Sequence, residues 1–205
     1  MLEIRVVSSD GPRGRARVAL LATQDPPAAL EAARHITHPW YRCQALANAA
    51  EHIRERKLAL KALQEALDAA DEQRAPNRVV TVASWPLRVL VVLGEDARVR
   101  SHLDRLMQRI AGEPHPIRRM DGQMALLAAL KGCAPEVSNP IFEALLKTLR
   151  GAHGWRRDNM LGELAGMLLQ RDKSERGWAL VDECELPREA RKVRKMLETR
   201  FGPRP

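Results

Sequence analysis

The chain has 205 residues, of which 45% are hydrophobic and only 3% aromatic, and its formal net charge is +8. This length fits one domain or a short array of repeats, and the Ala- and Leu-rich composition favours helices, because strands draw on aromatic and β-branched residues. The three cysteines lie far apart in the sequence, which argues against a disulfide framework and a zinc site. The most apolar stretch, residues 79–93, is too short to span a membrane. We therefore expect a cytoplasmic protein.

Residues 1–37 are predicted to form an N-terminal cap. Two short helical patterns, over residues 13–22 and 26–35, are separated by the sequence Gln-Asp-Pro-Pro at 24–27. Proline ends one helix and is tolerated in the first turn of the next, so this segment separates two helices. Arginines at 5, 13, 15 and 17 make this end of the chain basic.

Three short pieces of the chain are nearly identical and determine the expected architecture. They are His-Pro-Trp-Tyr-Arg at 38–42, His-Pro-Ile-Arg-Arg at 115–119 and His-Gly-Trp-Arg-Arg at 153–157. They lie 77 and 38 residues apart, so one period of about 38 residues fits both gaps. A period in this range is typical of stacked helical repeats, and each piece is followed by an apolar pattern of helical spacing.

This period divides the chain into repeats at residues 38–75, 76–114, 115–152 and 153–185. Each repeat is predicted to be a helix, a turn and a second helix. The second helices of two repeats end at Gly112 and Gly151, and a short turn then leads to the next repeat.

The repeat at 76–114 is the degenerate one. It begins with Pro76 and keeps Arg78, but it lacks the histidine of the other repeats. Pro86 is expected to kink or break its first helix. An alternative interpretation makes residues 88–94 a buried parallel strand, with residues 2–7 as a partner strand.

Residues 186–205 are predicted to form a C-terminal basic helix, from residue 188 to about 200, followed by a disordered tail. Residues 188–205 carry seven Arg and Lys residues against two Glu residues. A basic outer face suits a terminal element that faces water.

The segment Ala-Leu-Glu-Ala-Ala-Arg-His-Ile at 29–36, followed by Arg-Cys-Gln-Ala-Leu at 42–46, resembles the repeat of bacterial HEAT- and armadillo-like α-solenoids. The resemblance covers roughly residues 12–200. It implies an all-α, right-handed superhelix of about five stacked helix pairs in a single domain, 1–205, and such arrays usually serve as binding surfaces. His38, His115 and His153 depart from the bacterial pattern, which often has an acidic residue there.

Equivalent positions of a stacked array lie along one ridge, so the repeat predicts a row of arginines beside a row of histidines. Guanidinium groups close to helix N-termini favour anions. The same spacing also has a purely structural explanation, in which each arginine pairs with an acid of the next unit. The predicted partner-binding residues are Arg42, Arg78, Arg118, Arg119, Arg156 and Arg157.

From these features we expect a non-enzymatic scaffold, without cofactor or metal, that binds the acidic segment of a protein partner through a curved, Arg-rich surface. No serine-hydrolase, Walker or dinucleotide-binding motif is present. His35 and His38 have no further ligands near them in the sequence. The alternative is a sequence-tolerant nucleic-acid binder that uses the same ridge and the basic C-terminal helix.

A third hypothesis is a DNA glycosylase. Trp178 and Asp182 are four residues apart on one predicted helix face. This arrangement resembles HEAT-like alkylpurine DNA glycosylases, which combine a basic concave surface with Trp residues and an Asp. The hypothesis requires Asp182 in a pocket, and few repeats follow it to hold DNA. Trp40 and Trp155 occupy equivalent repeat positions and are expected in the core.

Overall fold

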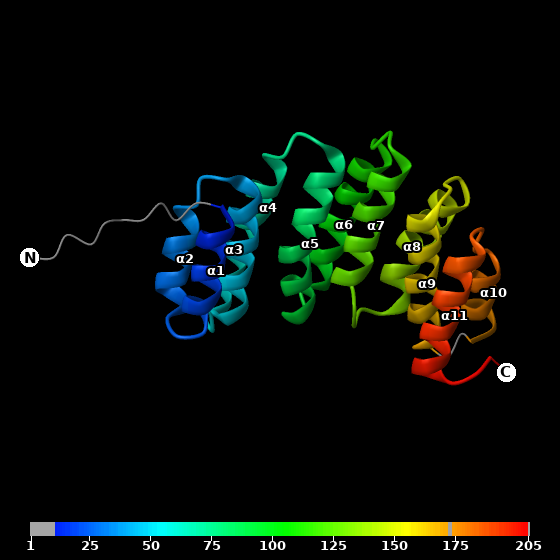
Figure 1. Ribbon diagram of the computed structural model, residues 1–205. Helices are drawn as coiled ribbons and strands as arrows, with labels where there is room; N and C mark the ends of the chain where they lie inside the picture. The colour runs from blue at the N-terminus through cyan, green and yellow to red at the C-terminus, as the bar shows by residue number, and fades with distance from the viewer. Residues whose placement is uncertain (1–10, 172–173, 205) are drawn as a thin grey trace, which may run out of the picture. The chain divides into compact units, whose positions relative to one another are not determined.

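The computed structural model describes residues 11–171 and 174–204, and these residues form an all-helical protein (Figure 1). This confirms the all-α part of the predicted fold class. None of the helices in the described part of the chain has both the length and the apolar composition that a membrane span requires. The helices are α1 Gly11–Ala22, α2 Pro26–Arg34, α3 Pro39–His52, α4 Arg56–Asp71, α5 Pro76–Val92, α6 Asp96–Ala111, α7 Pro116–Ala129, α8 Pro135–Arg150, α9 Trp155–Leu169, α10 Ser174–Asp182 and α11 Pro187–Phe201.

The three related pieces of sequence mark helix starts, as predicted. Helix α3 begins at Pro39 and α7 at Pro116, because the missing N–H of proline has no intrahelical partner in the first turn anyway. In the third piece a glycine takes the place of the proline. Gly154 precedes α9 with a φ of 95°, a left-handed conformation that glycine adopts without steric cost.

The chain divides into two compact units. The first comprises Met1–Pro114 and Asp121–Glu143, and the second comprises His115–Met120 and Ala144–Pro205. In the first unit α1, α3 and α5 pack against one another in sequence, and α2, α4 and α6 pack against them. In the second unit α9 packs against α10 and α11. Sequential packing of this kind is consistent with stacked helix pairs. A single domain over 1–205 stays a prediction.

Pro86 lies inside α5 and does not break it, so the expected break is wrong, and so is the strand at 88–94, whereas a kink stays a prediction. Residues 2–7, the partner strand of that alternative, lie outside the described residues. A proline at position 86 removes the N–H that would bond to the carbonyl of Val82 four residues earlier. The thiol of Cys43 in α3 donates to this carbonyl instead, with an Sγ–O distance of 3.4 Å. The neighbouring helix therefore satisfies the carbonyl that proline leaves open.

Candidate functional site

Arg42 joins the two ends of its own helix pair. Its guanidinium group donates to the carbonyls of Ile36 and Thr37, which precede α3, at 3.2 and 3.1 Å. It also forms an ion pair with Glu72, the first residue after α4. One side chain thereby holds the turn before α3 against the end of α4.

Arg157, the equivalent residue of α9, makes the same kind of connection from a buried position. Its Nε donates to the carbonyl of Leu149 in the last turn of α8 at 3.1 Å, and its Nη1 donates to the carbonyl of Glu183, directly after α10, at 2.9 Å. Nη1 also lies 2.7 Å from the carboxylate of Asp158, whose side chain is 0% exposed. The side chain of Arg157 is 6% exposed, so a partner has little access to it.

The other four predicted arginines lie closer to solvent. Arg78, in the first turn of α5, is exposed, and its guanidinium carbon lies 5.4 Å from the centre of the Trp40 ring, a cation–π distance. Arg118 and Arg156 are exposed, and Arg119 is half-buried. Arg78 belongs to the first unit and these three arginines to the second.

Ion pairs between helices occupy many further arginines. These pairs connect residues that are about one repeat apart in the sequence, so they bridge neighbouring helix pairs of the array. They support the structural explanation of the repeated arginines, although exposed pairs of this kind each stabilise a fold only weakly. The pairs in the first unit are Arg34 with Glu65, Arg56 with Glu95, Arg88 with Glu51 and Arg105 with Asp71.

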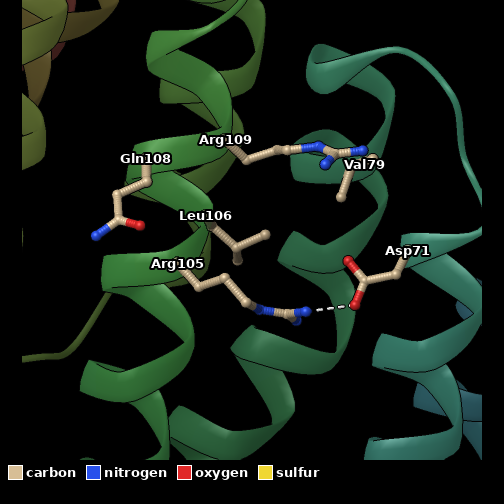
Figure 2. Close-up of a pocket in the computed structure, with 6 residues that line it drawn as sticks. All are labelled: Asp71, Val79, Arg105, Leu106, Gln108 and Arg109. Carbon is tan, nitrogen blue, oxygen red and sulfur yellow. Dashed lines mark hydrogen bonds and ion pairs between the residues drawn. The ribbon is translucent and has the colours of Figure 1, made fainter.

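A cleft between the end of α4, the first turn of α5 and the second half of α6 collects cationic side chains (Figure 2). We name it the α4–α6 cleft; its volume is about 330 Å³. Arg105 and Arg109 extend from α6 toward α4 and α5, one helical turn apart, and Arg105 meets Asp71. Arg109 is exposed, and Asp71 is the one acid among the described residues that line the cleft. The lining residues are Asp71, Val79, Arg105, Leu106, Gln108 and Arg109.

His102 lies on α6, one turn before Arg105. Burial lowers the pKa of His102, and the charges of Arg105 and Arg98 lower it further. The charges of Asp71 and Asp68 oppose this effect. The α4–α6 cleft thus combines an apolar floor with a positively charged rim, an arrangement that suits an apolar side chain flanked by carboxylates.

A second cavity of about 320 Å³ lies between α5 and α7 and is lined by Ser84, Trp85, Arg88, Ala125, Ala128 and Ala129. Its lining is mostly apolar, and its one cation, Arg88, is held by Glu51 at 2.7 Å. It therefore lacks the available positive charge that distinguishes the α4–α6 cleft.

The structure does not favour the glycosylase hypothesis. Trp178 is 3% exposed and belongs to the core. The carboxylate of Asp182 forms ion pairs with Arg194 and Arg204 at 3.4 and 2.9 Å. A base-excision site needs an aromatic surface and a carboxylate that a flipped base can reach, and these two residues do not provide them.

The sequence did not point to Arg105 and Arg109, because both lie on a second helix, away from the related pieces that open each repeat. A signal was nevertheless present. Arg98, Arg105 and Arg109 are spaced by seven and four residues, which places them on one helix face. Asp71 is the last residue of α4, shortly before the next repeat begins at Pro76, so the array brings it beside this face.

No protein-family model matches the sequence, and neither does any curated protein. Among solved structures, the chain is similar to Ton1535 from Thermococcus onnurineus NA1, with a TM-score of 0.68 and 17% sequence identity. The match covers 90% of this chain and 57% of Ton1535, so the chain spans little more than half of that protein. At this identity the similarity shows the fold alone.

Proposed function

We propose that this protein is a non-enzymatic helical-repeat scaffold whose α4–α6 cleft binds an acidic segment of a partner protein. The proposal includes the HEAT-like class and the right-handed superhelix that the repeats predict. Its main support is the positively charged rim of the cleft, where exposed Arg109 lies one helical turn from Arg105.

The proposed segment is short and carries at least two carboxylates. One carboxylate of the segment pairs with Arg109. A second carboxylate competes with Asp71 for Arg105, because a guanidinium group binds a carboxylate well through two parallel hydrogen bonds. An apolar side chain between them lies on Leu106 and Val79. Arg78, exposed in the same first turn of α5 as Val79, extends the positive surface beyond the cleft.

Of the six arginines expected to bind a partner, the proposal retains those that solvent reaches. Arg42 and Arg157 are engaged by the carbonyls at the ends of their own helix pairs, so the proposal assigns them to the fold. In the second unit Arg118 and Arg156 remain candidates for further contacts, with half-buried Arg119 beside Arg118.

Selection from a displayed random-peptide library tests the proposal with the intact protein. We expect enriched peptides to carry two or more Asp or Glu residues around an apolar residue. Arg109→Glu replaces attraction with repulsion and should weaken the binding of a selected peptide at least tenfold, since losing a charge-assisted contact costs about 1.5–3 kcal/mol.

Arg100→Glu is the matched control, because Arg100 is exposed near the opposite end of α6 and is not a lining residue of the cleft. It should leave the affinity within about twofold. Enrichment of peptides without acidic residues, or equal affinity of both variants, would rule out the cleft as the binding site.

A further inference from the structure

Helices α9 and α11 of the second unit run parallel and pack closely. Gly162 lies against Val193, and a Cβ atom at this glycine would be 2.8 Å from both valine methyl groups. Gly166 lies against Leu197 four residues later along both helices. One turn before Gly162, the Nζ atom of Lys192 is 3.5 Å from Oδ1 of Asn159. This register brings the N-terminal ends of the two helices to one level.

Trp155 opens α9 at this end and is 60% exposed. Its expected place in the core is therefore wrong. It lies on the same helix face as Asn159 and Gly162, which is the face that packs against α11. Val193 covers this face only from Gly162 onward, two turns after Trp155. The register places it at the level of Leu186, which is also exposed. The molecule thus presents a large aromatic ring to solvent beside the start of α11.

Cationic side chains lie along the outer face of α11, and one of them, Lys192, reaches Asn159 on the face of α9 that carries Trp155. They are exposed, while Val193 and Leu197 on the opposite face are buried. Two acids lie nearby: Glu185 is 2.9 Å from His153, and Glu189 is 3.5 Å from Lys192 and offsets part of that lysine's charge. The basic stripe of α11 comprises Arg188, Arg191, Lys192 and Lys195.

We propose that Trp155 and the basic stripe of α11 bind single-stranded nucleic acid. An exposed aromatic ring stacks on any base, and a row of cations beside it contacts successive phosphates. Arg188 and Lys195 are two helical turns apart, about 10 Å along the axis, which is the length of a few nucleotides. A flat exposed ring near cations offers a nucleobase a surface on which to stack.

This site lies in the second unit and does not depend on the α4–α6 cleft of the first. The two proposals can therefore fail separately.

Fluorescence anisotropy of the full chain with a labelled 20-nucleotide oligothymidine tests the site. Trp155→Ala should weaken binding about tenfold, because stacking of a base on an aromatic side chain contributes about 1–3 kcal/mol. Trp155→Phe should recover part of the affinity. Each of Arg188→Gln and Lys195→Gln should reduce the slope of log affinity against log salt by about 0.7.

Leu20→Ala is the matched control, because Leu20 is an exposed apolar residue of α1, in the first unit. It should bind like the unaltered protein, and thermal unfolding should show that all variants fold. Unchanged affinity of Trp155→Ala would overturn the proposal. Binding of a duplex as tightly as of the single strand would also overturn it, and so would displacement of the oligonucleotide by poly-glutamate at equal charge concentration, which would indicate an acidic protein partner.

Discussion

Arg157 and Asp158 form a buried ion pair that also makes hydrogen bonds to the backbone of neighbouring elements. Asp158 accepts hydrogen bonds from the backbone N–H groups of Glu185 and Leu186 at 3.2 and 2.8 Å. Arg157 covers carbonyls at the ends of α8 and α10. The pair therefore fixes the turn between α10 and α11, and the arginine that resembled a ligand-binding residue stabilises the fold.

Arg157→Ala should lower the free energy of unfolding by about 3 kcal/mol or more, because it leaves the charge of Asp158 buried without a partner. Denaturant titration followed by circular dichroism measures this loss. Arg156→Ala changes the adjacent exposed residue and should cost less than about 0.5 kcal/mol. Equal small losses in both variants would show that Arg157 is not a structural residue.

Cys43 compensates for the hydrogen bond that Pro86 removes from α5. Burial raises the pKa of the Cys43 thiol, so the thiol keeps its proton and remains a donor to the Val82 carbonyl. Cys43→Ala should cost about 1–3 kcal/mol, the penalty for an unsatisfied buried carbonyl. Cys43→Ser keeps a donor and should cost less.

A double-mutant cycle with Pro86→Ala isolates this role. The substitution restores an N–H at position 86, so Cys43→Ala should be less costly in that background, by about 1 kcal/mol. Unfolding free energies that add without coupling would contradict the account.

At the scale of elements, the seam between α9 and α11 depends on small residues at defined positions. Gly162 leaves room for Val193, whereas a Cβ atom at Gly166 would lie at an ordinary contact distance of 3.5 Å from Leu197. The two glycines therefore differ in what they tolerate, although both lie in the same helix.

Gly162→Ala should destabilise the protein by about 1–2 kcal/mol through overpacking, despite the better helix propensity of alanine. Gly166→Ala should stabilise it by up to about 1 kcal/mol, because the propensity gain meets no clash. Thermal unfolding of both variants measures the difference. Val193→Ala should rescue Gly162→Ala, and failure of that rescue would mean that the clash is not the cause.

Helix starts were predictable from the sequence because proline and the following apolar period act locally. The continuity of α5 was not, because the thiol that satisfies the Val82 carbonyl comes from a residue 39 positions earlier. The exposure of Trp155 was not predictable either. Trp40 and Trp155 share a repeat position, but neither lies in the core: Trp40 is half-buried with Arg78 of α5 over its ring, whereas Trp155 lies before the close packing of α11. Burial depends on the neighbour, and the repeat pattern does not specify the neighbour.

For the whole molecule, the net charge of +8 does not measure the positive charge that a partner can reach, because many arginines are already paired with acids between helices. The cations left at the α4–α6 cleft and along α11 are the ones we propose to face partners. The count of arginines alone could not separate these two groups, because the pairs form only when distant repeats come together.

Hydrogen–deuterium exchange of the full chain with a selected acidic peptide measures directly where the partner binds. We expect slower exchange in residues 105–111 of α6 and in the first turn of α5 when the peptide is bound, with no change at residues 96–100. Protection confined to other helices, or an unchanged exchange pattern with the peptide bound at saturation, would contradict the proposed site.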